Sequence, residues 1–187
     1  MPPVTEKKSS WALLVVDMQA PLLQNTSPAK TALRRCHFAI KAARLLEAPI
    51  LFTEQSPQKL QPILPELRAL APEAPVFAKS AFSALQEPGL RETLNQNGTT
   101  HLLLAGLETT ICIYQTALEG QTIGLDVTLL SDCLAARRPQ DAATVLKALS
   151  RHPHTHILPS ETVFYSLLAN ATHPHFRRFT QLVKNHA

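Results

Sequence analysis

Three side chains that could carry out covalent chemistry together follow three separate apolar stretches of the sequence. Asp17 comes directly after WALLVV, Lys79 ends PVFAK, and Cys112 comes after HLLLAGLETTI. A carboxylate, an ammonium group and a thiol can supply the base, the charge stabilisation and the nucleophile of covalent acyl transfer. Each residue alone also has a plainer interpretation: Asp17 as a loop cap, Lys79 as a solvated strand end that pairs with Glu54 or another surface acid, and Cys112 as an inert small hydrophobe.

The pattern of apolar runs predicts the elements that position these residues. Nearly continuous apolar runs are typical of strands buried on both faces of a parallel sheet. They occupy residues 11–16, 49–52, 75–78, 101–105, 126–130 and, more weakly, 155–158, with helical patterns near 30–47, 86–97, 112–123 and 139–150. This alternation predicts a three-layer α/β/α, Rossmann-like domain whose six-stranded parallel sheet has the order 3-2-1-4-5-6.

In such a sheet the ligand site lies at the carboxyl ends of the strands, where the winding reverses between the first and fourth strands. Asp17 and Cys112 follow these two strands. Lys79 follows the third strand, two places or about 10 Å away, a distance that a lysine side chain can reach across. We expect residues 54–70 to form a long loop with a short helix that contributes substrate contacts, and residues 161–169 and 174–185 to form helices used in packing or oligomerisation.

The composition bounds the class of protein. With 187 residues, 45% hydrophobic, 17% charged and no linker, the sequence predicts a single domain over residues 1–187. Its net charge of +4 comes from scattered basic residues, and only 5% of the residues are aromatic. We therefore expect no nucleic-acid partner.

The first apolar run has six residues, too few for a signal peptide or a membrane span, and the three cysteines have no CxxC pairing. These features favour a cytoplasmic protein without disulfides, in which Cys36 and Cys133 are core or near-surface thiols.

Longer motifs carry a resemblance to a known family. LLVVDMQ, FAKSAFSAL and LLLAGLETTICIYQTALEGQTIGLDVTLLSDCLAAR resemble the isochorismatase-like cysteine hydrolases. TEQSPQKLQPILPEL and the tail THPHFRRFTQLV are closest to the isochorismatase domain-containing subgroup. The similarity covers nearly the whole chain. It implies an Asp-Lys-Cys triad formed by Asp17, Lys79 and Cys112, and a homo-oligomer.

The resemblance also implies how the oxyanion is held. In the family the peptide bond that corresponds to Leu107–Glu108 is cis, and backbone amides at the positions of Glu108 and Cys112 form the oxyanion hole. Gly106 would give the room that such a bond needs. The sequence departs from the superfamily at Glu108, where a smaller residue is common, although the closest subgroup tolerates GIE.

The sequence argues against the metal found in nicotinamidases of this superfamily. There, an aspartate and histidines hold the metal in the loop after the second strand, whereas here no histidine lies between His37 and His101. We predict no catalytic metal and no cofactor. The late histidines are better explained by surface loops; they are His152, His154, His156, His173 and His175. Asp132 is expected to cap or brace the loop after the fifth strand.

These observations predict a metal-independent cysteine hydrolase that cleaves a small amide or related acyl substrate through a thioester. Asp17 would take the proton of Cys112, and Lys79 would stabilise negative charge and keep the thiol acidic. The candidate pocket walls are Phe82, Trp11 and Tyr114, each of which is otherwise plain core. The alternative is a non-catalytic binding or scaffold protein that retains the fold.

Overall fold

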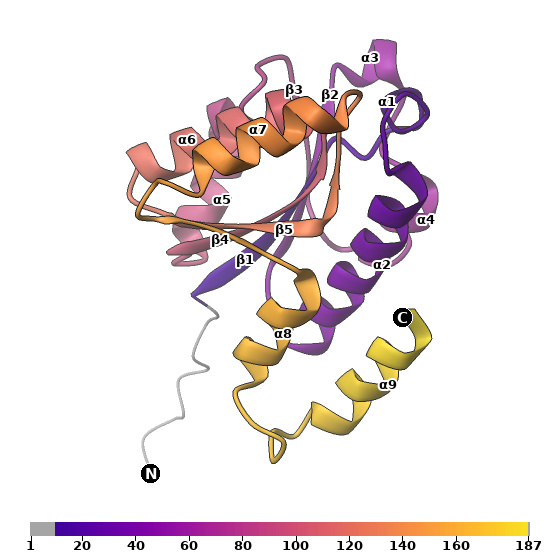
Figure 1. Ribbon diagram of the computed structural model, residues 1–187, viewed down its shortest axis with the longest axis vertical. Coiled ribbons are helices and arrows are strands. Elements are labelled where there is room, and N and C mark those ends of the chain that lie inside the picture. The colour runs from indigo at the N-terminus through magenta and orange to yellow at the C-terminus, as the bar shows by residue number, and fades with distance from the viewer. Residues whose placement is uncertain (1–9, 187) are drawn as a thin grey trace.

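A parallel sheet of six strands runs through the protein in the computed structural model, which describes residues 10–186 (Figure 1). Across the sheet the strands are β3 (Val76–Lys79), β2 (Ile50–Gln55), β1 (Trp11–Val16), β4 (His101–Leu107), β5 (Asp126–Ala135) and β6 (Thr155–Leu158). The predicted order 3-2-1-4-5-6 is confirmed. Both β2 and β4 continue past the ends of their apolar runs, because polar or glycine residues extend the same ladders.

Helices cover both faces of this sheet (Figure 1). On one face lie α5 (Pro88–Gln96), α6 (Tyr114–Thr122) and α7 (Pro139–Leu149), and on the other lie α2 (Ala29–Leu45), α8 (Ser160–Leu168) and α9 (Phe176–His186). Short helices follow the carboxyl ends of two strands: α1 (Ala20–Leu23) follows β1, and α3 (Pro57–Leu60) follows β2. The expected loop at 54–70 contains the end of β2, α3 and a further short helix, α4 (Pro65–Arg68). No helix among residues 10–186 is long and apolar enough to cross a membrane.

Each face of the sheet has its own hydrophobic core. In β1, Leu13 and Val15 pack toward α2, α8 and α9, whereas Ala12, Leu14 and Val16 pack toward α5, α6 and α7. All five side chains are fully buried. A strand covered on both faces needs apolar residues at successive positions, which is why this stretch shows no polar alternation.

The end of β4 lies unusually close to β1. Gly106 has φ +118°, and a Cβ at this position would clash with the backbone of Val16. Only glycine adopts this conformation at little cost and also leaves the space that the neighbouring strand occupies. Gly106 therefore brings the two strand ends that carry Asp17 and Cys112 into close contact.

The chain leaves β4 without the predicted cis peptide bond. Within residues 10–186 the one cis bond is Ser27–Pro28, so Leu107–Glu108 is trans and that prediction is wrong. Gly106 takes the unusual backbone conformation, and Glu108 is extended with φ −75° and ψ 123°.

A brace joins the bulged strand β5 to two helices. The pairing of β4 with β5 shifts between Leu104 and Gly106, which leaves Asp132 in the bulged part of β5. Its carboxylate accepts hydrogen bonds from the Ser160 amide at 2.7 Å and from Arg35 Nε at 2.6 Å. The expected bracing role of Asp132 thus extends to α2 and α8.

Candidate active site

Asp17 ends β1 in a fixed and fully buried position. Its backbone is left-handed, with φ 50°, and its amide donates to the Thr53 carbonyl at 3.1 Å. The Thr53 hydroxyl donates to Asp17 Oδ1 at 2.7 Å. The other carboxylate oxygen, Oδ2, faces the Lys79 ammonium at 2.7 Å and accepts no further hydrogen bond among the described residues. One oxygen is therefore anchored, and the other faces the reacting groups.

Lys79 reaches across β2 to meet this carboxylate. Its side chain is 1% exposed, and its ammonium also donates to Gln55 Oε1 at 2.6 Å and to the carbonyls of Ala81 and Phe82, each at 3.2 Å. The alternative that Lys79 pairs with Glu54 is wrong, because Glu54 accepts instead from the Ile63 amide. The ammonium group is thus fixed by four oxygen atoms beside the thiol.

Cys112 completes the cluster from a distorted helical turn. It lies in η2 (Thr109–Ile113), a π-helical turn that leads into α6, and its Sγ is 3.7 Å from Lys79 Nζ. Single π-helical turns occur frequently at functional sites because they re-aim a side chain without ending the helix. The structure therefore brings Asp17, Lys79 and Cys112 together.

The environment of Cys112 favours the thiol over the thiolate. Burial raises the pKa of Cys112 to about 12; the Asp17 carboxylate also raises it, and Lys79 opposes the rise. Lys79 lowers the pKa of the thiol as expected, but it does not keep the thiol acidic, because burial and Asp17 outweigh it. The charge of Lys79 is already paired with Asp17, so it does not outweigh desolvation and the neighbouring carboxylate.

A cavity of about 630 Å³ opens onto the sulfur of Cys112. Its lining residues are Pro21, Leu22, Asn25, Gln55, Leu60, Phe82, Glu108, Ile111, Cys112 and Arg137. The wall is mainly apolar with a few polar groups, as is usual for a small-molecule site.

Of the three predicted wall residues, only Phe82 lines this cavity. Trp11 starts β1 at the opposite edge of the sheet and packs edge-on against Phe164 with ring centroids 6.0 Å apart. Tyr114 starts α6 and packs against the core on the α5–α7 face. Neither residue belongs to the wall, because a residue near the site in sequence need not point toward it.

Glu108 holds Arg137 at the rim of the cavity. The Glu108 side chain is 8% exposed, and its two carboxylate oxygens accept from the Arg137 amide at 3.2 and 3.3 Å. The Arg137 guanidinium, whose side chain is 65% exposed, lies with Nε 3.6 Å from Glu108 Oε1. This pair could not be predicted from the sequence, because the two residues lie in different loops.

Two glutamine side chains that were not predicted from the sequence hold the site together: Gln19, which is buried, and Gln55, which is half-buried. Gln19 is fully buried; its Oε1 accepts from the Gln55 amide at 2.8 Å and its Nε2 donates to the Gln55 carbonyl at 3.1 Å. Gln55 in turn holds Lys79. A signal was available, since these glutamines follow strands as Asp17 and Lys79 do.

The residues at the end of β2 do not fit a catalytic metal. Glu54 is engaged by the Ile63 amide, and Gln55 by Lys79. Within the part of the chain that the structure describes, no three histidine, cysteine, aspartate or glutamate side chains form a cluster that could hold a metal ion.

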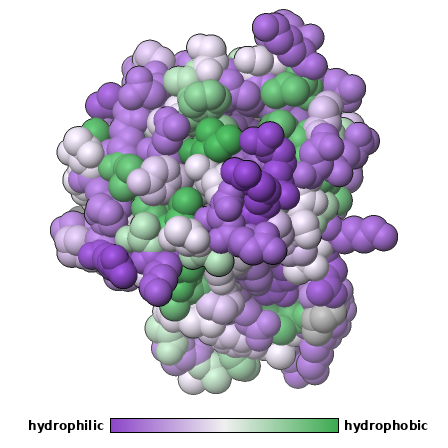
Figure 2. Space-filling model, turned by 45° about the horizontal axis from the view of Figure 1, so that its top comes forward, coloured by the Kyte–Doolittle hydropathy of each residue, from purple (hydrophilic) through white to green (hydrophobic). Residues whose placement is uncertain are grey.

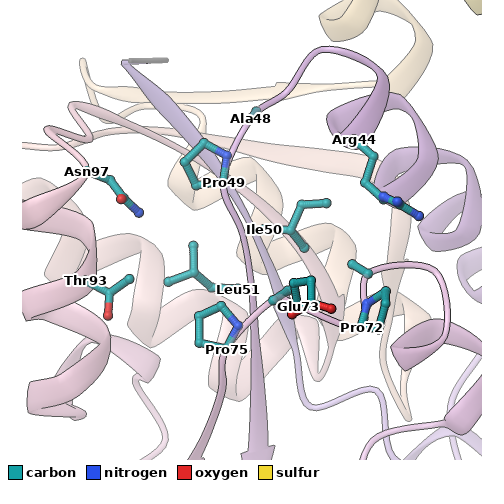
Figure 3. A pocket seen from close by; sticks show the side chains of 12 residues that line it. Arg44, Ala48, Pro49, Ile50, Leu51, Pro72, Glu73, Pro75, Thr93 and Asn97 are labelled. Carbon is teal, nitrogen blue, oxygen red and sulfur yellow. The ribbon is translucent and has the colours of Figure 1, made fainter. Parts of the chain in front are cut away.

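A second cavity lies at the opposite edge of the sheet, near the amino ends of β2 and β3 (Figure 3). It has a volume of about 470 Å³ and is lined by residues such as Arg44, Pro49, Glu73 and Pro75. Its wall contains no thiol and none of the three clustered residues. Of the three clustered residues, Cys112 lines the first of these two cavities and none lines the second.

Comparisons with known proteins agree with this architecture. The profile of the isochorismatase domain matches residues 11–161. The chain belongs to the isochorismatase family. Isochorismatase domain-containing protein 2 from Bos taurus is 36% identical over 146 residues, which cover 78% of this chain and 69% of the bovine protein.

Solved structures share the fold. The MAR1 ribonuclease from Caenorhabditis elegans superposes with a TM-score of 0.89 at 27% identity, covering 95% of this chain and 91% of that one. The YcaC gene product from Escherichia coli, described as an octameric hydrolase of unknown specificity, superposes with a TM-score of 0.83 at 21% identity. It covers 99% of this isochorismatase-family chain and 97% of the YcaC chain.

Proposed function

We propose that this isochorismatase-family protein is a metal-independent cysteine hydrolase of small amides or related acyl compounds. The observation that carries the proposal is the contact of Lys79 with both partners, 2.7 Å from Asp17 Oδ2 and 3.7 Å from Cys112 Sγ, beside a largely apolar cavity. A buried nucleophile, a base and a fixed cation at one point are the parts of a covalent acyl-transfer site.

The reaction starts from the neutral thiol. Asp17 Oδ2 takes the proton of Cys112 as the sulfur forms a bond to the carbonyl carbon, and the electron pair of the C=O bond moves onto the carbonyl oxygen. The positive charge of Lys79 stabilises the negative charge that leaves Asp17 during this step. Backbone amides of Glu108 and Cys112 are proposed to hold the resulting oxyanion. When the tetrahedral intermediate collapses, Asp17 returns the proton to the leaving amine, which departs and leaves a thioester on Cys112.

Water completes the cycle. Asp17 takes a proton from the attacking water, the C–S bond breaks, and the sulfur recovers a proton as the carboxylic acid leaves. In both halves one proton moves between sulfur, carboxylate and substrate, so the net charge of the cluster stays constant. Constant charge suits a site that is almost closed to water.

The test is hydrolysis of a panel of small primary amides, measured as ammonia release. We expect turnover that falls by at least about a thousandfold in Cys112→Ala, and an acyl adduct on the Cys112 peptide in quenched wild-type samples. Cys36→Ala, which removes a thiol from the core on the other face of the sheet, is the matched control and retains turnover if it folds. Because the nematode relative is described as a ribonuclease, the panel includes an RNA oligonucleotide. RNA cleavage without amide turnover contradicts the proposal, and failure of every substrate and adduct favours the binding or scaffold protein.

We also propose that the protein is a cytoplasmic homo-oligomer. Its three cysteines are free and buried, as expected in a reducing compartment, and the YcaC relative is octameric. A mass of one 20.6 kDa chain in light scattering would contradict the oligomer. Recovery of the protein outside the cytosolic fraction of lysed cells would contradict the location.

A further inference from the structure

The wall of the 630 Å³ cavity contains two charged residues, Glu108 and Arg137. They are not equivalent as ligands. The Glu108 carboxylate is 8% exposed, and its two oxygens share the single backbone N–H of Arg137. It therefore presents little surface to a substrate, whereas the Arg137 side chain is 65% exposed.

The guanidinium of Arg137 has capacity to spare. Its Nε lies 3.6 Å from Glu108 Oε1, and its two terminal nitrogens make no hydrogen bond with any residue in the part of the chain that the structure describes. A guanidinium group presents a planar fork of donors that matches a carboxylate. The cavity is therefore lined both by the exposed, positively charged guanidinium of Arg137 and by the nearly buried nucleophile Cys112.

The neighbouring Arg138, by contrast, forms an ion pair with an acidic residue of its own. Its Nε lies 2.6 Å from Asp141 Oδ2, and its side chain is 80% exposed. Both arginines line an adjoining cavity, but only Arg137 also lines the one that contains Cys112. The arrangement of Glu108 thus selects Arg137, and not its neighbour, for the rim of the site.

We propose that the substrate carries an anionic group, most simply a carboxylate, at the end remote from the bond that is cleaved, and that Arg137 binds this group. Glu108 is the positioning residue, because it fixes the Arg137 backbone and contacts the guanidinium through Nε, which leaves the two terminal nitrogens for the substrate. The apolar wall, which includes Leu22, Phe82 and Ile111, contacts the carbon chain between the two ends. As a statement about substrate, this inference rests on the proposed hydrolase function; as a statement about binding, it does not.

The binding test uses protection of Cys112 from iodoacetamide at pH 9, followed by mass spectrometry. The probes are the dicarboxylates malonate, succinate, glutarate and adipate, each compared with its neutral diamide. We expect at least one diacid to slow alkylation of Cys112 while its diamide does so much less. Arg137→Gln should weaken this protection about tenfold or more, whereas the matched control Arg138→Gln should leave it within about twofold.

Three results overturn the proposal: no diacid protects, diamides protect equally, or the two arginine variants behave alike. A second arm compares hydrolysis of the monoamides of the same diacids with that of uncharged amides such as butyramide. Protection without hydrolysis keeps the anion site and contradicts the hydrolase, and hydrolysis that prefers butyramide keeps the hydrolase and contradicts the anion site. The two proposals therefore fail separately.

Discussion

At Cys112, burial and the Asp17 carboxylate both favour the neutral thiol, and Lys79 alone favours the thiolate. The resting site thus keeps its negative charge on Asp17, and Cys112 gives up its proton only when a carbonyl group is present to be attacked. This arrangement differs from a thiolate formed in advance, because it protects the sulfur from adventitious alkylation and oxidation. If this account is correct, a substitution of Asp17 should make Cys112 react faster with an alkylating reagent and yet abolish hydrolysis.

Asp17→Asn should lower the pKa of Cys112 and abolish amide hydrolysis. The substitution removes the carboxylate charge that raises the thiol pKa and leaves the Lys79 charge that lowers it. Alkylation of Cys112 by iodoacetamide at pH 8 should therefore become at least about tenfold faster, a shift of one pKa unit or more. The measurement is the alkylation rate against pH, read at Cys112 by mass spectrometry.

Two controls accompany this experiment. Asp126→Asn removes an exposed carboxylate at the amino end of β5 and should change neither rate. Lys79→Met should slow alkylation, because it removes the charge that favours the thiolate. Slower alkylation in Asp17→Asn would contradict the electrostatic account.

At the scale of elements, the loop after β2 is held by one buried side chain. The Gln19 amide nitrogen donates to the carbonyls of Gln55, Leu60 and Gln61, and its oxygen accepts from the Gln55 amide. This loop contains two residues with left-handed backbone, Ser56 and Gln61. Such a conformation persists where surrounding contacts enforce it, and here it places Gln55 against Lys79.

Gln19→Leu should loosen this loop before it unfolds the protein. The change leaves several buried backbone groups without partners, which costs about 2 kcal/mol or more in the free energy of unfolding. Amide hydrogen exchange in residues 55–61 should accelerate at least about tenfold, while β1 and β4 stay protected, and hydrolysis should fall. Gln86→Leu, an exposed glutamine bonded to Glu119, is the control. Uniform acceleration across the sheet would contradict a local role.

Gly106→Ala tests the close approach of β4 to β1. A Cβ at Gly106 would meet the backbone of Val16, which cannot move aside without breaking the sheet, so the free energy of unfolding should fall by more than about 4 kcal/mol. Gly98 and Gly124 also have positive φ but have nothing within 4 Å of an added Cβ. Their alanine variants should lose only about 1 kcal/mol each. Urea unfolding measures the difference, and equal losses at all three positions would contradict the steric argument.

The elements were largely predictable, and the reason is visible in β1 and β4. Their apolar runs are long because both faces are covered, and Asp17 interrupts the first run where the strand ends. The trans bond at Leu107–Glu108 was not predictable, because the conformation of Gly106 is set by contact with β1. The protonation of Cys112 also depends on distances and burial that spacing along the chain does not contain.

The pocket wall was predicted poorly for a related reason. Phe82 lies in the loop after β3 and faces the cavity, whereas Trp11 sits at the other end of its strand. Arg137 meets Glu108 only because the β5 bulge and the turn after β4 bring two loops together. Contacts between loops depend on tertiary structure, so sequence periodicity does not reveal them.

At the scale of the whole molecule, the reactive edge and the brace lie in different parts of the fold. The face shown in Figure 2, with the top of Figure 1 turned forward, is mostly hydrophilic with small hydrophobic patches. On the opposite side of the sheet from α6 and α7, Arg35 of α2 contacts Asp132 of β5, Ser160 of α8 and the His186 carbonyl of α9. This brace fastens both C-terminal helices to the sheet.

The brace makes stability depend on pH. Burial raises the pKa of Asp132, but hydrogen bonds from Ser160 and Arg35 outweigh it and leave the pKa below the ordinary value of 3.8. Because the folded state binds this proton less tightly than the unfolded state, the contribution is present above about pH 4 and is lost as the pH falls through the folded pKa.

Asp132→Asn should therefore destabilise the protein at pH 7 by about 3 kcal/mol, since it leaves the nearly buried Arg35 without its ionic partner. The deficit should narrow as the pH falls below 4, where the wild-type carboxylate becomes protonated as well. Asp141→Asn is the control: it breaks an exposed pair with Arg138 and should cost less than about 1 kcal/mol at either pH. Urea unfolding of the wild type and both variants at pH 7 and pH 3 gives the loss of unfolding free energy for each variant at each pH. A deficit that stays constant with pH would show that Asp132 acts through packing and not through its charge.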